Sequence, residues 1–364
     1  MNFDLSETQK LFQSTVERFT RDVDIAGREK IRANTCAYDM GRWAELAELG
    51  LLAVAANEEQ GGLDGSLIDL STIAETFGFN NALDPWLENG ALPIRLLGVA
   101  NKTDLLDTLL DGSSIAALAF AEPNARYDTQ AIATQASKDK NRDGFILNGR
   151  KRLVMGGAFA DTLLVTANQD SSFGIYCVPN NAEGVTSQCY RLADGSFATE
   201  ISLNDVEVPA TAKLSINSEE FQQVVAEISI LACAEMLGLS QLLLNDTIAY
   251  VKERRQFDVS IGSFQAIQHG LVDCFSELEQ MRSMLYRTLL LEKNSTSQWH
   301  ANAMGAKSFI GDGANFIARN AVQYHGAMGI TDEVAVGHAM KRIMILTRLF
   351  GDSSHSIQSY LKAV

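Results

Sequence analysis

Apolar residues recur at helical spacing through the first 114 positions of the chain. Leu11, Val16 and Phe19 follow a Ser6-x-x-Gln9 pattern, which predicts a capping box at the start of a helix. The same spacing returns in two further groups: Trp43, Leu46 and Leu49; and Leu70, Ile73, Ala74 and Phe77. A Gly-rich acidic loop at 57–66 separates these groups. The pattern therefore predicts an N-terminal α-helical domain over residues 1–114.

Between residues 115 and 212 the pattern changes to short apolar or alternating runs separated by turn residues. Such runs are typical of strands, and six occur, at 115–120, 130–136, 144–154, 162–168, 173–178 and 200–208. Asn148-Gly149 predicts a two-residue hairpin turn, and Pro209 closes the region. We expect a central domain over 115–212 that forms a small antiparallel barrel or sandwich of six to eight strands.

Helical spacing resumes in the last part of the chain. Four apolar stripes occur, at Val224, Ile228, Leu231, Leu239 and Leu242; Leu271, Phe275, Leu278, Leu285 and Leu289; Ala303, Ala306, Ile310 and Ile317; and Met340, Ile343, Met344 and Leu346. They predict a four-helix bundle over residues 213–364. The fold class is therefore α+β and multidomain: a helical domain, a β barrel or sandwich, and a helical bundle.

Charge and cysteine content narrow the function classes. The formal net charge of −15 argues against nucleic-acid and anionic-lipid partners. No run of eighteen apolar residues and no basic-then-apolar leader occurs, so we expect neither a membrane span nor a signal peptide. The odd set Cys36, Cys177, Cys189, Cys233 and Cys274 contains no C-x-x-C pair. It indicates a reducing cytoplasm and argues against a disulfide framework or a zinc site.

Several short motifs, in this order along the chain, carry a resemblance. Glu58-Glu59-Gln60-Gly61-Gly62, Ala121-Glu122-Pro123 and Gly149-Arg150-Lys151 lie in the first two regions. The last region contains Arg254-Arg255-Gln256-Phe257 followed by Phe264-Gln265, and then Gln323-Tyr324-His325-Gly326. Together they are similar to the P-E-x-x-G-G, T-E-P, G-x-K, R-x-Q-F and Q-x-x-G-G motifs of the acyl-CoA dehydrogenase family. The resemblance covers nearly the whole chain.

The resemblance implies an FAD cofactor, an acyl-CoA substrate and α,β-dehydrogenation of the thioester. The R-x-Q-F and Q-x-x-G-G loops would contact the FAD of a neighbouring subunit, where an arginine fork suits phosphate. The implied cofactor-binding residues are Arg254, Gln256, Phe257, Phe264, Gln265, Gln323, His325 and Gly326, with Ala121 and Met155 on the chain's own flavin side. The resemblance also implies a homo- or hetero-oligomer, a dimer or tetramer, with an electron-transfer flavoprotein as acceptor.

The family's catalytic base has no clear counterpart here. Phe350 occupies the position of the usual glutamate, and Asp352, two residues later, either substitutes for it or caps a final helix. Other members carry the base on the first bundle helix, at the position of Ile228. This leaves Glu227, which is adjacent, and Glu235, which lies nearer the middle of the apolar stripe. Either is a candidate base, and either could equally be a helix-edge acid paired with a basic neighbour.

Departures from the family pattern concentrate on the residues that would hold the chain's own FAD. Ala121 replaces a threonine, and Leu153-Val154-Met155 replaces a W-I-T strand. This asymmetry resembles the divergent subunits of heteromeric acyl-CoA dehydrogenases, some of which act on sterol side chains. Three hypotheses follow: a dehydrogenase subunit that catalyses or supports desaturation, a catalytically silent structural partner, and a di-iron bundle oxidase. The last is disfavoured, because Asp352-x-x-His355 is the sole approach to a di-iron motif.

Overall fold

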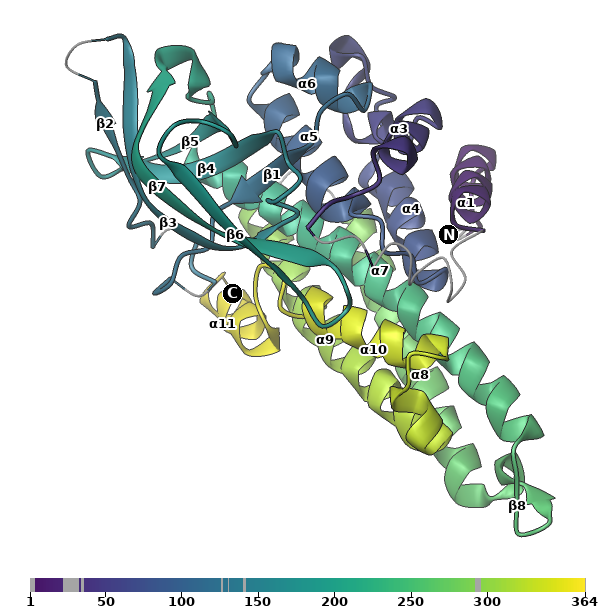
Figure 1. Cartoon of the computed structure of the whole chain (residues 1–364). Helices are drawn as coiled ribbons and strands as arrows, with labels where there is room; N and C mark the ends of the chain where they lie inside the picture. Colours follow the sequence, from purple (N-terminus) through teal and green to yellow (C-terminus); the bar gives the residue numbers. More distant parts are fainter. Residues whose placement is uncertain are drawn as a thin grey trace. The chain divides into compact units, whose positions relative to one another are not determined.

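The computed structural model describes residues 4–21, 33, 36–125, 127–129, 131–139, 142–291 and 296–363. The chain divides into two compact units, which are taken one at a time below. The sheet unit comprises Ile31–Gly65 and Leu83–Ile228. The helical unit comprises Met1–Lys30, Ser66–Ala82 and Ser229–Val364. The predicted order of helices, strands and helices is present, and the predicted fold class is confirmed (Figure 1). The domain boundaries at 114 and 212 stay a prediction.

The sheet unit is built on one seven-stranded sheet. Its strands are β1 (Ala116–Ala119), β2 (Gln135–Lys138), β3 (Gly144–Met155), β4 (Thr162–Gln169), β5 (Ser172–Pro179), β6 (Val185–Arg191) and β7 (Phe197–Pro209). The order is β1-β4-β2-β3-β7-β6, with β5 on the other side of β4. The expected antiparallel pattern holds for most pairs, but β1 pairs with β4 in parallel. A parallel pair needs a long crossover, and the segment containing β2 and β3 provides it.

The predicted hairpin turn at Asn148-Gly149 is wrong. Both residues lie inside β3, where the pairing with β7 shifts register between Leu147 and Gly149. The Asn148 side chain exchanges hydrogen bonds with Asp205, donating from Nδ2 and accepting from the Asp205 amide. A Cβ at Gly149 would meet the Thr134 side chain at 2.4 Å. The Asn-Gly pair therefore serves a bulge that lets β2 approach closely, not a chain reversal.

Helices of the sheet unit pack beside this sheet (Figure 1). They are α3 (Met40–Glu48), the 3₁₀ turns Ala53–Ala55, Glu58–Gln60 and Ala210–Ala212, the π-helix Trp86–Ala91, α5 (Leu92–Val99) and α6 (Thr103–Leu110). Trp43 and Trp86 are fully buried, and the indole of Trp86 donates to the carbonyl of Leu51. The π-helix is of interest because such segments are frequent at functional sites.

A disulfide between Cys36 and Cys189 overturns the expectation that the cysteines are all free thiols. The two Cα atoms lie 6.1 Å apart, a separation that a disulfide can span. The bond joins the segment before α3 to β6 across 153 positions of sequence. Cysteine spacing could not reveal this pairing, because partners distant in sequence carry no local pattern. Cys177, Cys233 and Cys274 are free and buried.

Long helices dominate the helical unit. They are α1 (Glu7–Thr20), α4 (Leu67–Phe79), α7 (Ser218–Glu253, whose first eleven residues belong to the sheet unit), α8 (Gln265–Leu290), α9 (Thr296–His325), α10 (Ala335–Leu346) and α11 (Ser353–Ala363). The capping box predicted at Ser6 is present. Short connections are β8 (Arg255–Gln256), β9 (Val259–Ser260) and the 3₁₀ turns Ile261–Ser263 and Gly326–Ile330. In Figure 1, α8 and α9 run side by side.

Helix α7 is long and apolar enough to cross a membrane by length and composition, contrary to the expectation that no such segment occurs. However, 89% of its most apolar window is buried inside the protein, as in a core helix. Two glycines allow α7 to lie against α4 at backbone distance. A Cβ at Gly238 would meet the carbonyl oxygen of Glu75 at 1.9 Å, and one at Gly78 would meet that of Glu235 at 2.1 Å. This close crossing fixes where Glu75 and Glu235 lie.

Candidate functional site

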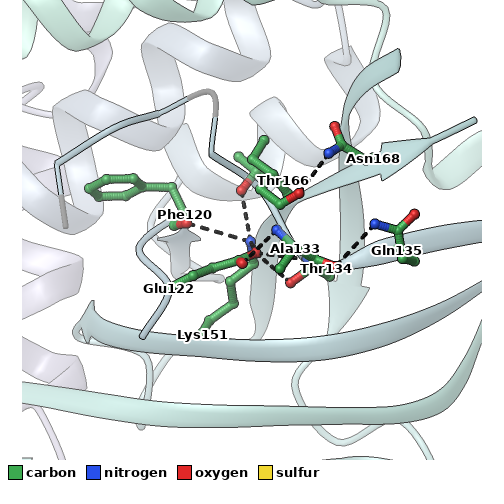
Figure 2. A network of polar contacts seen from close by, with 9 residues as sticks. Phe120, Glu122, Ala133, Thr134, Gln135, Lys151, Thr166 and Asn168 are labelled. Carbon is green, nitrogen blue, oxygen red and sulfur yellow. Dashed lines mark hydrogen bonds and ion pairs between the residues drawn. The ribbon is translucent and has the colours of Figure 1, made fainter. Parts of the chain in front are cut away.

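A buried ion pair anchors the loop after β1 to the sheet. Nζ of Lys151 donates to Oε1 of Glu122 at 2.6 Å and to the hydroxyl of Thr166 at 2.9 Å (Figure 2). Glu122 also accepts from the amides of Ala133 and Thr134 and from the Thr134 hydroxyl. Burial lowers the pKa of Lys151 to about 8, against the opposing attraction of Glu122. Burial alone would raise the pKa of Glu122, but Lys151 and the hydrogen bonds around it hold that pKa below its usual value.

This network holds the flavin-side candidates Ala121 and Met155 in place. The carbonyl of Ala121 accepts from the amide of Arg152 at 2.8 Å, within the same strand as Met155. Nδ2 of Asn89, on the π-helix, donates to the carbonyls of Ala116 and Met155. Neither Ala121 nor Met155 offers a side-chain hydrogen-bond donor, and Leu153 between them is half exposed with a φ of 52°. A flavin on this surface would be held by backbone groups and packing.

The same loop lines an open cleft of about 480 Å³ in the sheet unit. Its lining consists of Glu122–Ala125, Ala131–Thr134, Gly149 and Arg150. Arg126, which the sequence places in this loop, lies outside the described residues. The guanidinium of Arg150 is the cationic group of this lining at its exposed edge.

Glu227, the first-ranked candidate base, is paired with an arginine. Its Oε2 accepts from Nη2 of Arg95 at 2.7 Å and from Nε at 3.1 Å, while Nε2 of Gln223 donates to Oε1 at 3.4 Å. The glutamate is buried, and 23% of the Arg95 side chain is exposed. The alternative of a helix-edge acid with a basic partner describes this geometry, although the partner comes from α5 rather than from α7.

Glu235 is held more tightly still. Its Oε1 accepts from Nε of Arg342 at 2.6 Å and its Oε2 from Nη2 at 3.1 Å, and both side chains are buried. This is the fork-to-carboxylate geometry of a strong, oriented ion pair. It ties α7 to α10 inside the helical unit. Both oxygens of Glu235 are therefore occupied by one guanidinium.

Asp352 and Phe350 lie in the loop between α10 and α11. Oδ1 of Asp352 accepts from the amide of His355 at 2.9 Å, the contact expected of an N-cap. Phe350 is buried, with a left-handed φ of 59°, unusual for an aromatic residue. Nζ of Lys307, buried on α9, donates to the carbonyl of Leu346 at 2.8 Å and to that of Gly351 at 3.4 Å. These two hydrogen bonds from Lys307 therefore fix the position of the loop.

The Arg-Gln-Phe segment forms an exposed hairpin at the end of α7. β8 pairs with β9, and Phe257 at its tip is 87% exposed with a φ of 53°. Nη2 of Arg255 donates to the carbonyl of Asp258, which closes the turn. Arg254, Gln256 and Gln265 are exposed, and Phe264 meets Phe257 edge-to-face at 6.4 Å. The hairpin presents its aromatic and guanidinium groups outward.

The loop that contains Gln323-Tyr324-His325-Gly326 lies beside this hairpin. The ring of His325 stacks on Tyr250 at 4.3 Å, and the amide of Arg254 donates to the carbonyl of Tyr250. Gln323 is exposed, and a Cβ at Gly326 would meet nothing within 4 Å. His325 itself is buried, with Nδ1 on the carbonyl of Ala321 at 2.8 Å. The two loops therefore form one exposed surface, and His325 supports it from within.

The residues fit FAD unevenly. The exposed side chains of Arg254, Gln256, Gln265 and Gln323 carry the donors that phosphate and ribose oxygens need. The two residues Ala121 and Met155 offer backbone groups but no side-chain hydroxyl. When bound, FAD would supply hydride acceptance at its flavin ring. Within the described residues, no group of three or more His, Cys, Asp and Glu side chains is placed to hold a metal ion.

The sequence did not identify Arg95 and Arg342 as partners of the candidate bases. A signal existed for Arg342, which stands inside the apolar stripe of Met340, Ile343 and Leu346, where a charge needs a partner. Arg95 carries no comparable signal. Lys307 lies beside the apolar stripe of Ala306 and Ile310, and its carbonyl partners were not predicted from the sequence either. In each case the partner is far away in sequence, so local spacing could not supply it.

Comparison with known proteins gives one consistent result. Three family models match the chain: acyl-CoA dehydrogenase N-terminal domain over residues 6–85, middle domain over 117–206 and C-terminal domain over 223–362. A probable acyl-CoA dehydrogenase of Bacillus subtilis, YngJ, is 30% identical over 98% of this chain and 97% of its own length. Benzylmalonyl-CoA dehydrogenase of Aromatoleum aromaticum is 28% identical over 94% of each chain.

Solved structures of related proteins are similar to this chain over nearly its whole length. A variant of the Tcur3481-Tcur3483 steroid ACAD is 25% identical, covers 98% of this chain and 96% of its own, and superposes with a TM-score of 0.87. The ChsE4-ChsE5 complex from Mycobacterium tuberculosis is 21% identical, with a TM-score of 0.89 over 100% of this chain and 98% of its own. Because the identity to the ChsE4-ChsE5 complex is only 21%, this similarity is evidence of a shared fold alone.

Proposed function

The chain belongs to the acyl-CoA dehydrogenase family, and on that premise we propose that it is an FAD-binding subunit that supports α,β-desaturation of an acyl-CoA without supplying the base. The base would come from a homologous chain in the same oligomer. Electrons would leave through an electron-transfer flavoprotein. The proposal follows the supporting role within the first hypothesis drawn from the sequence, a dehydrogenase subunit that catalyses or supports desaturation.

The observation that carries this proposal is that each candidate carboxylate already has a structural task. A general base must hold a lone pair within hydrogen-bond reach of the substrate proton. In Glu235 both oxygens accept from Arg342, and in Glu227 Oε2 accepts twice from Arg95 while Oε1 accepts from Gln223. Asp352 caps α11, and the family's own base position holds Phe350, which cannot take a proton.

The uneven fit to FAD supports the assignment to a mixed oligomer. The outward-facing hairpin and its neighbouring loop keep the donors that a second subunit's cofactor would need, whereas Ala121 and Met155 have no side-chain hydroxyl. The Tcur3481-Tcur3483 relative is a steroid ACAD whose name joins two chains. By that analogy we propose a heteromeric enzyme acting on a bulky acyl group, such as a sterol side chain.

Catalysis by this chain itself is the competing function. Glu227 favours it, because it lies one residue before the position that some members use and its Arg95 partner retains contact with solvent. On this alternative Arg95 would move aside when substrate binds. The oligomer would then consist of identical subunits.

Flavin content and flavin reduction distinguish the two. The chain is purified alone and, separately, co-expressed with a homologous acyl-CoA dehydrogenase chain encoded beside it. FAD per chain is measured from absorbance, and each sample is mixed anaerobically with acyl-CoA. We expect no flavin reduction by the chain alone, and about half occupancy with reduction in the mixed oligomer. One FAD per chain that acyl-CoA reduces in the isolated protein would refute the proposal.

A further inference from the structure

A separate cavity of about 510 Å³ lies in the helical unit, and none of its lining residues is a candidate base or a candidate cofactor ligand. Side chains of α1, α4, α7 and α8 line it, together with Asp4 and Leu5, which precede α1. Its volume falls within the range of about 300–1,000 Å³ that is typical of small-molecule sites. All of its lining residues belong to one compact unit.

Most of the accessible surface of this cavity is apolar, although polar side chains such as Gln9, Thr72 and Tyr286 also line it. The apolar part is formed by Leu5, Ile68, Phe79, Leu285, Leu289 and Leu290. Phe79 and Leu290 remain substantially exposed although they line a hollow. Apolar surface held in contact with water is unfavourable by roughly 25 cal/mol per Å². A guest with an apolar body would therefore gain free energy by covering these side chains.

The floor of the cavity carries one ion pair. Nη1 of Arg282 donates to Oε1 of Glu75 at 2.8 Å, and Nη2 donates to Oε1 of Gln241 at 3.0 Å. About a quarter of each charged side chain stays accessible, 27% for Glu75 and 24% for Arg282. Protein nevertheless surrounds Glu75 closely enough that desolvation raises its pKa, in spite of Arg282. Both residues of the pair line the cavity, so a bound ligand can reach their accessible part.

The polar and charged side chains of the cavity determine which polar group a bound ligand can carry. The charge of Arg282 is already matched by Glu75 at 2.8 Å and by Glu279 at 3.6 Å, so a carboxylate would bring a third negative charge to one guanidinium. The second oxygen of Glu75 accepts no hydrogen bond among the described residues. Ser71, which also lines the cavity, is buried and its hydroxyl has no partner among the described residues. A neutral hydroxyl group can donate to Glu75 without adding charge to a partly desolvated pair.

We propose that this cavity binds a neutral amphiphile consisting of an apolar chain or ring body and one hydroxyl group that donates to Glu75. The site is independent of the proposed function. It involves none of the residues assigned to FAD or to the base. The guest is thus distinct from an acyl-CoA, whose phosphates and thioester call for donors that this floor does not offer.

The test compares three probes of one chain length with different head groups. 1-Octanol, octylammonium and octanoate are titrated into the full-length protein by isothermal titration calorimetry. We expect one equivalent of octanol to bind, at least tenfold more tightly than octanoate and more tightly than octylammonium. Absence of saturable octanol binding, or tighter binding of either charged probe, would overturn the proposal.

Variants locate the binding. Thr72→Phe fills the cavity from α4, and Leu289→Phe fills it from α8 should the first variant fail to fold. Thr8→Phe, on the exposed side of α1, is the matched control. Octanol affinity should fall at least tenfold in either filled variant and remain at the wild-type value in the control. Unchanged affinity in a filled variant that folds would place the binding elsewhere and refute the assignment.

Discussion

Replacing Glu227 with glutamine separates a structural acid from a catalytic one. The substitution keeps the shape of the side chain but removes the charge that Arg95 contacts through two N–H groups, at 2.7 and 3.1 Å. Hydrogen bonds to a charged group are worth about 1.5–3 kcal/mol, and losing one partner of a fully buried pair costs about 3–5 kcal/mol. Because 23% of the Arg95 side chain remains exposed, water can compensate in part. We therefore expect a loss of about 2 kcal/mol in the free energy of unfolding.

The Glu227→Gln variant and the wild type are compared by two measurements on the flavin-containing oligomer. Denaturant unfolding gives the stability change, and anaerobic mixing with acyl-CoA gives the rate of flavin reduction. Loss of a general base typically lowers a rate by about 10²–10⁴-fold. On the structural reading, Glu227→Gln should reduce the rate by no more than about twofold while lowering stability.

A double variant supplies the control. Arg95→Met combined with Glu227→Met replaces the ion pair by apolar side chains of similar length, a change that is often neutral or stabilising. Stability should return toward the wild-type value, and the rate should stay near wild type. A hundredfold rate loss that persists in the double variant after stability has recovered would show that Glu227 is the base, and the structural reading would be wrong.

Three further outcomes are expected. Phe350→Glu places a carboxylate at the base position that the resemblance implies, so in the chain purified alone and supplied with FAD acyl-CoA should reduce the flavin at least about tenfold faster than in wild type, with an unchanged rate counting against the assignment. Lys307, whose pKa burial lowers to about 8, binds its proton less tightly when folded; the free energy of unfolding should therefore rise from pH 8 toward 10, by at most about 1.4 kcal/mol per unit, relative to a Lys307→Met variant that lacks this slope. Peptide mapping without reductant should recover Cys36 linked to Cys189, and Cys36→Ser should lower stability by about 3–5 kcal/mol, with no further loss on adding dithiothreitol.

The sequence predicted those parts of the fold that depend on local pattern. The capping box at Ser6 lies within one turn, and both of its partners are present. The change from helical spacing to short runs at residue 115 correctly marked the start of the strands. The Asn148-Gly149 prediction failed because the same dipeptide suits both a tight turn and a bulge. The deciding contacts come from Asp205 and Thr134, which lie elsewhere in the chain.

The candidate site shows the same limit more sharply. Arg254, Gln256 and Phe257 could be placed on an exposed loop because the whole motif is contiguous. For His325 the motif gave the right loop but not the orientation of the ring, which a stack on Tyr250 turns inward. Phe275, expected within an apolar stripe of α8, is exposed, whereas Leu278 and Leu285 of the same stripe are buried. Spacing gives a helix face but not which face is covered.

An acidic residue on a buried helix face has two physical explanations, and the structure distinguishes them by the partner. A base needs an oxygen open to substrate, whereas a structural acid needs a cation that offsets its desolvation. Glu235 has its cation, Arg342, and Glu227 has Arg95, so each would be costly to remove whether or not the chain catalyses anything. Retention of these glutamates therefore does not argue for activity. Under the proposed function, the group whose identity bears on activity is Phe350, because an aromatic ring at a left-handed loop position performs none of the tasks of the carboxylate that the resemblance implies there.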